Sequence, residues 1–138
     1  MADIFSPEKR SQIMRKICPK NSTYERIVQS IVSSLRFRYE TNVSSLPGKP
    51  DLVFKRRKKV IFINGCFWHG HNKCKRSKLP STNRDFWSKK IWWNIFKDGK
   101  TRRLLREKGW KYLIIWQCKI RVRNMQILEN KIRDFLRN

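Results

Sequence analysis

Acidic residues are scarce in this chain of 138 residues. It has 10 Asp and Glu residues against 34 Lys and Arg residues, and its formal net charge is +24. An imbalance of this size predicts a polyanionic partner, and nucleic acid fits it best. An anionic membrane surface is the weaker alternative.

Long apolar runs are absent too. No stretch approaches the roughly 18 consecutive apolar residues of a membrane span, and the first residues, MADIFSPEKR, contain no apolar signal-peptide core. We therefore expect a cytoplasmic protein that does not associate with membranes. In that compartment the four cysteines are predicted to be metal ligands or free thiols rather than disulfides.

Internal repeats and low-complexity linkers are also lacking, so residues 1–138 are predicted to form a single domain. A hydrophobic content of 39%, with 12% aromatic residues, is sufficient for a packed core. Residues 1–20 are expected to form a basic helix or arm, because Ser6 and Pro7 suit the start of a helix.

Apolar periodicity predicts the remaining elements. Helices are expected at 21–35, 81–110 and 124–136, and strands at 36–40, 51–54, 60–64 and 112–116. Ser22 and Glu25 form a capping box for the first of these helices, and the long helix should end near Gly109, with Gly99 as a potential kink. This order predicts an α/β domain in which helices flank a mixed sheet.

Two further features are assigned to structure rather than to chemistry. The five consecutive cations at 55–59 are expected to form a solvated hairpin turn, with phosphate binding as the alternative. Trp92, Trp93, Trp110 and Trp116 are expected to pack in the core.

The segment INGCFWHGHNKC, at 63–74, combines metal-ligand residues with bulky aromatic residues. Cys66, His71 and Cys74 have the compact spacing of a zinc site, although His69 could replace His71 on spacing alone. Cys118 follows the strand 112–116 by two residues, as Cys66 follows the strand 60–64. If these strands are parallel neighbours, the four ligands form a closed structural site. The alternative is that the loop is metal-free and Cys118 is a buried thiol; Cys18 is read as a plain thiol.

The dipeptide Pro50-Asp51 opens a strand that is followed by a second strand ending at Asn64. Many metal-dependent nucleases begin in this way, with a carboxylate that holds Mg²⁺ next to the scissile phosphate. Such nucleases usually add an acidic residue and a lysine on the second strand, and here that strand ends in Phe62, Ile63 and Asn64. Taken alone, the dipeptide does not establish a nuclease site, because a Pro-Gly-x-Pro-Asp loop often only shapes a turn.

Several segments together resemble the very-short-patch-repair (Vsr) endonuclease family: MADIF, RSQIMRKI, SLPGKPD, VIFINGCFWHGH, FWSKKI and EKGWKYLIIWQC, from residue 1 to about 118. The resemblance implies a restriction-endonuclease-like fold with a structural zinc. It also implies strand-specific nicking of double-stranded DNA at T:G mismatches, which arise when 5-methylcytosine deaminates in a methyltransferase's recognition sequence. Very short patch repair then begins at the nick.

The resemblance also implies roles for residues around the scissile phosphate. Asp51 and the backbone carbonyl of Ile63 would be ligands of a catalytic Mg²⁺. His69 would be the general acid/base, Asp98 would orient it, and Glu25 would lie near the active site as well as in the capping box.

The remaining matches concern zinc and DNA. Cys66, His71, Cys74 and Cys118 fall on the family's zinc positions, which favours His71 over His69. Phe67, Trp68 and Trp87 match aromatic residues that wedge into the base stack beside the mismatch, and Met14 matches a residue that approaches from the opposite groove. Zinc would hold the loop rigid while Phe67 and Trp68 are driven between base pairs, at a cost of a few kcal/mol per unstacked step.

One residue departs from the family pattern. Asn64 stands where better-known members have a second catalytic histidine, and asparagine does not exchange a proton near neutral pH. Two other functions remain open: a sequence-specific restriction or nicking enzyme of the same fold, and a non-catalytic, zinc-stabilised DNA-binding protein. We expect a monomer that acts alongside mismatch-repair proteins and a cytosine-5 methyltransferase system.

Overall fold

The computed structural model describes residues 21–41, 43–72 and 74–138. The predicted arm at 1–20 lies outside this range, and so do its residues Met14 and Cys18. The side chain of Ser22 is also outside the described part, so the predicted capping box is not tested.

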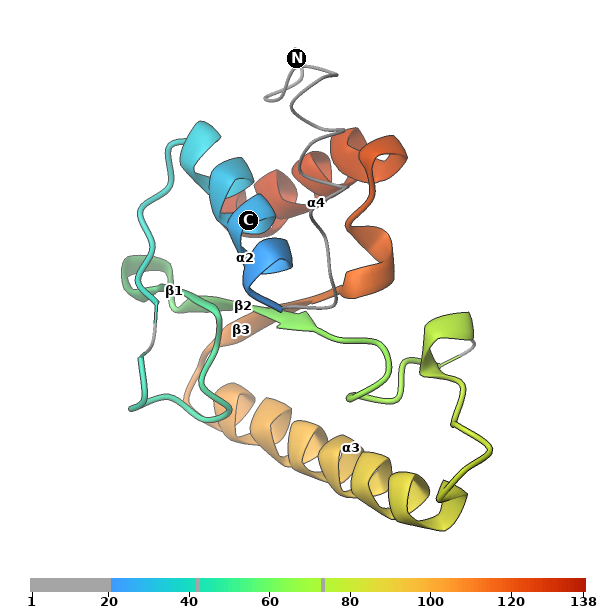
Figure 1. Cartoon of the computed structure of the whole chain (residues 1–138). Helices are drawn as coiled ribbons and strands as arrows, with labels where there is room; N and C mark the ends of the chain where they lie inside the picture. The colour runs from blue at the N-terminus through green and yellow to red at the C-terminus, as the bar shows by residue number, and fades with distance from the viewer. Residues whose placement is uncertain (1–20, 42, 73) are drawn as a thin grey trace.

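The described part of the chain has a three-stranded mixed sheet at its centre (Figure 1). Strand β1 (Leu52–Phe54) pairs antiparallel with β2 (Lys59–Asn64), and β2 pairs in parallel with β3 (Lys111–Trp116). The short helix η1 (Lys55–Arg57) connects β1 to β2. These three strands confirm the predicted hairpin and the parallel neighbour on which the zinc-site prediction depended.

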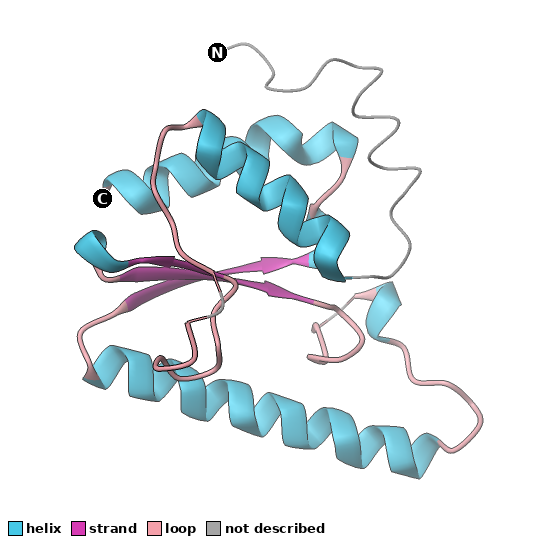
Figure 2. Ribbon diagram, turned by 60° about the vertical axis from the view of Figure 1, so that its left-hand side comes forward, coloured by secondary structure: helices cyan, strands magenta, loops and turns pink. Residues whose placement is uncertain are grey.

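Helices cover both faces of this sheet (Figure 2). Helices α2 (Asn21–Ser34) and α4 (Met125–Arg137) lie on one face, and α3 (Arg84–Glu107) lies on the other. Short 3-10 helices follow in the connections: η2 (Lys75–Ser77), η3 (Gln117–Lys119) and η4 (Val122–Asn124). The predicted fold class, a mixed sheet flanked by helices, is confirmed.

Side chains of β2 alternate between two hydrophobic clusters, as the pleat requires. Ile61 and Ile63 join the main core with α2 and α4, whereas Val60 joins a smaller cluster with Leu105 of α3. Both faces are therefore buried, which explains why β2 has a nearly continuous apolar sequence. No helix in the described ranges has both the length and the hydropathy to span a bilayer.

The predicted strand at 36–40 is wrong except at its last residue. Only Glu40 pairs with β1, through backbone hydrogen bonds in both directions with Val53 at 2.9 and 2.8 Å. Along a strand, the N–H and C=O groups of successive residues point alternately to the strand on one side and to the strand on the other. Strand β1 has three residues. Val53 is therefore the one residue of β1 whose N–H and C=O point to this edge.

The basic run at 55–59 is a turn whose first four residues are exposed, as predicted, but Lys59 is buried. Its ammonium group donates to the carbonyl of Phe135 at 2.6 Å, and Arg57 donates to the carbonyl of Leu136 at 2.9 Å. Cations at a helix C-terminus satisfy carbonyls that have no partner within the helix and interact favourably with its dipole. Lys59 and Arg57 thus anchor α4 to β2.

The prediction that Trp92 and Trp93 pack in the core is wrong. Their exposed fractions are 70% and 58%, whereas Trp110 and Trp116 are partly buried. Helix α3 contacts the sheet along one side, and no described element packs against its opposite side. The same helix was expected to reach from 81 to 110; it is continuous from Arg84 to Glu107, through Gly99.

Candidate metal centre and nuclease site

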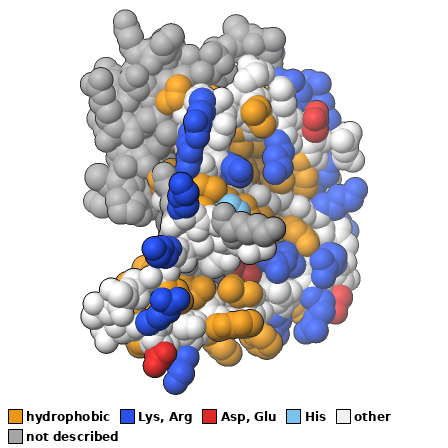
Figure 3. All heavy atoms as spheres, turned by 90° about the vertical axis from the view of Figure 1, so that its right-hand side faces the viewer, with side chains coloured by type: hydrophobic (Ala, Val, Ile, Leu, Met, Phe, Trp, Pro, Cys, Tyr) orange, Lys and Arg blue, Asp and Glu red, His pale blue; other side chains and the backbone are white. Residues whose placement is uncertain are grey.

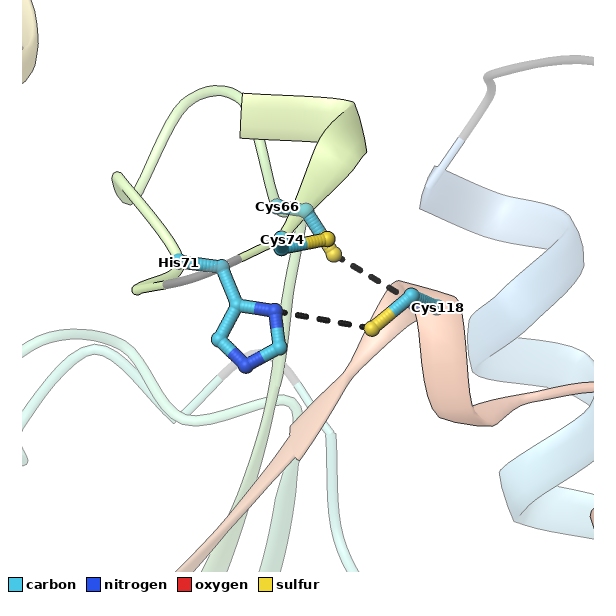
Figure 4. A group of neighbouring side chains, drawn as sticks. All are labelled: Cys66, His71, Cys74 and Cys118. Atoms are coloured by element: carbon cyan, nitrogen blue, oxygen red, sulfur yellow. Dashed lines mark hydrogen bonds between the residues drawn. The ribbon is translucent and has the colours of Figure 1, made fainter. Parts of the chain in front are cut away.

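Four metal-ligand side chains meet at the edge of the sheet (Figure 4). The sulfur atoms of Cys66, Cys74 and Cys118 and a ring nitrogen of His71 all lie within 4.8 Å of one another. Because β2 and β3 are parallel, the segments that follow them leave the sheet at the same edge, and Cys66 and Cys118 come together there. His71 belongs to this group, and His69 does not.

The chemistry of the donors fits a zinc ion. Burial raises the pKa of the Cys66 thiol to about 12, so a bare thiolate is unfavourable there and a divalent cation would stabilise it. Burial also lowers the pKa of His71, which keeps the imidazole neutral as a metal ligand must be. The His71 ring stacks on Trp116, with centroids 4.1 Å apart. Three sulfurs and one nitrogen are a typical structural zinc set.

Between the two ligands Cys66 and His71, the side chains of the loop differ in exposure. Cys66 is fully buried, whereas Trp68 is 42% exposed. The amide of His71 donates to the carbonyl of Cys66 at 2.9 Å, which closes the loop. Gly70 has a φ of +58°, and a Cβ atom there would lie 2.7 Å from a methyl group of Ile95, so only glycine allows this approach to α3.

His69 points to helix α3. Its Nδ1 lies 2.6 Å from the Oδ2 atom of Asp98, and both side chains are about one-quarter to one-third exposed, at 30% and 26%. With Nδ1 donating to the carboxylate, Nε2 is left to exchange a proton, as in histidines that act as general acids or bases. The predicted pair of His69 and Asp98 is therefore in contact.

Asp51 lies at the start of β1, and its carboxylate accepts a 2.6 Å hydrogen bond from the amide of Ile63 on β2. Burial, opposed by the hydrogen bond from the Ile63 amide and reinforced by Glu25 on α2, raises the pKa of Asp51 to about 7. Asp51 thus lies beside a second carboxylate, that of Glu25, and a divalent cation bound here would favour the charged form of Asp51. Asn64, 7% exposed, ends β2 next to this group.

The aromatic residues Phe67, Trp68 and Trp87 form a mutual cluster, the aromatic trio. Their ring centroids lie 5.3 to 5.6 Å apart in edge-to-face arrangements. Trp87 comes from the first turn of α3, so this helix supplies one ring and also supports the loop that supplies the other two. The structure thus brings together the three rings predicted to enter the base stack.

Two residues next to the trio were missed in the sequence. Asn94 donates from its side chain to the carbonyl of Trp68 at 2.8 Å, and the ammonium group of Lys90 lies 5.4 Å from the centre of the Trp68 ring. Asn94 precedes Asp98 by one helical turn, so both face the loop. This spacing from Asp98 is the sequence signal from which the role of Asn94 could have been predicted. Asn94 and Lys90 both contact Trp68, and so tie the loop to α3 at this residue.

Comparison with known proteins identifies the family. A model of the family "DNA mismatch endonuclease Vsr" matches residues 2–76. The DNA mismatch endonuclease Vsr of Escherichia coli is 37% identical over 123 residues, which cover 89% of this chain and 78% of that protein. The chain belongs to the Vsr family.

Other relatives of this Vsr protein have been named for nicking. The type II nicking enzyme V.XorIIP of Xanthomonas oryzae is 38% identical, covering 99% of this chain and 98% of the relative. V.NmeAIP of Neisseria meningitidis, also named a type II nicking enzyme, is 37% identical over 99% of this chain and 96% of its own length. The Vsr protein described here is therefore a DNA endonuclease, and the alternative of a non-catalytic binding protein is not supported.

The raised pKa of Asp51 gives a prediction about stability. The folded carboxyl holds its proton up to about pH 7 and the unfolded one only to about 3.8, so stability falls as pH rises through that window. Asp51→Asn, which can still accept the Ile63 hydrogen bond, removes this effect. In buffer without Mg²⁺, the variant should exceed the wild type in free energy of unfolding at pH 8, by at most about 4 kcal/mol.

The difference in free energy of unfolding between the two proteins should shrink towards pH 5. The zinc site also becomes less stable at low pH, but to the same extent in both proteins. The measurement is urea unfolding across that range, and Mg²⁺ should stabilise the wild type more than the variant. Identical pH profiles for the two proteins would mean that folding does not raise the pKa of Asp51.

Proposed function

We propose that this Vsr protein nicks one strand of double-stranded DNA at T:G mismatches that arise from deaminated 5-methylcytosine, and so starts very short patch repair. One observation carries the proposal. The loop between Cys66 and His71 carries Phe67 and Trp68, two rings of the aromatic trio, together with His69, which contacts Asp98 of α3. In the proposal, Phe67 and Trp68 open the base stack and His69 moves a proton, and the nearness of these residues on one short segment supports it.

In this proposal each residue has a defined task. Asp51 and the carbonyl of Ile63 hold Mg²⁺, with Glu25 beside them; when bound, the ion supplies Lewis-acid polarisation of the scissile phosphate. Asp98 holds Nδ1 of His69, which leaves Nε2 to transfer a proton. Asn64 is placed to position a water molecule by hydrogen bonding, since an amide does not exchange protons near neutral pH.

Zinc would give the loop its rigidity. Three of the four ligand residues lie on the connection between β2 and η2, and the fourth, Cys118, lies on η3 after β3. Joining them lowers the conformational freedom of the loop before DNA binds, so less ordering entropy is lost when Phe67 and Trp68 enter the stack. A mispaired step costs least to open, and this difference contributes to selectivity for the mismatch.

A second candidate is a sequence-specific nicking enzyme that needs no mismatch. It is favoured by the relatives named type II nicking enzymes, such as V.XorIIP. The deciding experiment is nicking of matched and T:G-mismatched duplexes across a panel of methylation-site contexts, with and without Mg²⁺. The proposal expects nicking of the mismatched duplexes with Mg²⁺. Equal nicking of matched duplexes would establish the second candidate instead.

The proposal extends to the wider system as well. The enzyme would act as a monomer, next to a cytosine-5 methyltransferase that creates the vulnerable sites and mismatch-repair proteins that share the substrate. Sedimentation of the DNA-bound enzyme would test the monomer directly.

The aromatic trio gives a second prediction. Replacing Phe67 and Trp68 together with alanine should reduce the preference for mismatched over matched DNA much more than it reduces general affinity. General affinity depends on phosphate contacts, so the salt slope of about −0.9 per neutralised phosphate should barely change. Competition binding with both duplexes at several salt concentrations measures the two quantities separately. An intact mismatch preference in the double variant would remove these rings from recognition.

A further inference from the structure

The outer side of α3 carries large aromatic side chains that nothing in the described part of the chain covers. Trp92, Trp93 and Phe96 are 70%, 58% and 62% exposed, and we call these three residues the α3 aromatic face. Figure 3 shows apolar side chains gathered at the bottom of the molecule, where α3 runs, with Lys and Arg side chains beside them. Clustered apolar exposure of this kind marks a binding surface in soluble proteins.

This face is separate from the nuclease site. Trp93 and Asp98 are five residues apart, which places them about 140° apart around a helix of 3.6 residues per turn. Asp98 binds His69, and Ile91, on the same side, is buried. The α3 aromatic face therefore points away from the zinc loop. Two of its rings contact each other: those of Trp93 and Phe96 stack with centroids 5.8 Å apart.

Cations alternate with these rings. Lys89, Lys97, Lys100 and Arg103 are all exposed, and the ammonium group of Lys97 lies 5.8 Å from the centre of the Trp93 ring. Between 86 and 103 the single acidic residue is Asp98, which faces the other way. A second copy of the chain would bring the same cations, and a net charge of +24, into contact with this face. The surface is therefore poorly suited to self-association.

Exposed rings among cations are the composition with which proteins bind single-stranded nucleic acid, because bases stack on the rings while cations contact phosphates. The phosphates of a duplex would contact the cations, but its bases would not stack on the rings because they are already stacked on each other. We propose that the α3 aromatic face binds single-stranded DNA, with unpaired bases on Trp92, Trp93 and Phe96. This rests on the proposed function, because a nick creates the end from which a strand can unpair.

The position of the face relative to the trio supports this occupant over an acidic protein. Phe86, on the first turn of α3, contacts the Trp87 ring of the trio at 5.2 Å between centroids and precedes Trp93 by two helical turns. A strand separated at the trio therefore meets the face along the same helix. An acidic protein would satisfy the same cations but has no such connection to the substrate.

The test uses a fluorescein-labelled oligothymidylate of about 12 nucleotides, a length within the usual range of such sites. Three proteins are compared with the wild type: a triple variant Trp92→Ser, Trp93→Ser and Phe96→Ser; a variant with Trp92→Phe and Trp93→Phe; and Ile127→Ser. Ile127, on α4, is 67% exposed and serves as the matched control for losing an exposed apolar side chain. Thermal unfolding of each protein checks the fold.

The triple serine variant should bind the oligonucleotide at least about tenfold more weakly, since loss of a single stacked base changes affinity by roughly five- to hundredfold. The phenylalanine variant and Ile127→Ser should bind nearly as the wild type does, and nicking of duplex DNA should be unchanged in all of them. Measuring at several salt concentrations separates stacking from phosphate contacts.

Wild-type affinity in the triple serine variant would overturn the proposal and leave the face to an acidic protein. An equal loss of duplex affinity would make the face a general DNA contact, and loss of self-association in sedimentation would make it a contact between copies; both also overturn it. A wild type that nicks no duplex would instead defeat the proposed function, while the oligonucleotide comparison would still stand.

Discussion

Replacing His69 with alanine is expected to slow single-turnover nicking of a T:G duplex by about 10²–10⁴-fold, the usual contribution of general acid/base catalysis. The chain has two histidines, and His71 lies within the Cys/His cluster. His69 is then the one imidazole placed to transfer a proton. Its Nδ1 is engaged by Asp98 at 2.6 Å, so the reaction would use Nε2.

Variants of Asn64 provide the comparison for His69→Ala. Asn64→Ala should lose much less activity than His69→Ala, because the amide transfers no proton. Asn64→His would restore the two-histidine arrangement and should raise the rate by about tenfold or less on the same scale, since in the proposed mechanism Mg²⁺ and Asp51 would supply the larger electrostatic contribution. Rates against pH for all three variants give the test. If Asn64→Ala is the slower enzyme, or His69→Ala matches the wild type, proton transfer does not run through His69.

Replacing Cys118 with alanine is expected to unfold much of the chain at room temperature. A structural zinc site contributes about 10–16 kcal/mol of apparent binding free energy in small zinc domains, which is comparable with the whole stability of a domain of about 5–15 kcal/mol. The cluster also joins η3 to the loop after β2, through the amide of Cys118 and the sulfur of Cys66 at 3.4 Å. Removing one ligand would therefore separate two parts of the fold.

Elemental analysis should find one zinc per wild-type chain and a reduced amount in Cys118→Ala, whose circular dichroism should show a less ordered protein. Cys18→Ala is the matched control, because the sequence analysis assigns Cys18 as a plain thiol, and this variant should retain both zinc and stability. An active wild-type preparation without zinc would show that the cluster stabilises the loop by some other means.

The local sequence determined a large part of this structure. Strands β2 and β3 are runs of β-branched and aromatic residues between turn signals, a composition that favours strands. Their parallel pairing brought Cys66 and Cys118 to one edge, as the shared two-residue offset predicted. The apolar periodicity that predicted the helix at 124–136 also agrees with the buried side of α4, on which Leu128, Ile132 and Leu136 lie.

Other features depended on contacts between distant segments. Spacing left His69 and His71 equivalent as ligands; Asp98, 29 residues away, holds the first, and Cys118 lies beside the second. In the sequence, Lys59 is one of five similar cations. It is a buried cap of a helix C-terminus only because α4 packs next to it in the fold. Helix α3 has apolar residues on nearly every side, so its pattern did not show which tryptophans would be covered. Burial depends on how many elements pack around a helix, and that number is a property of the whole fold rather than of any local stretch of sequence.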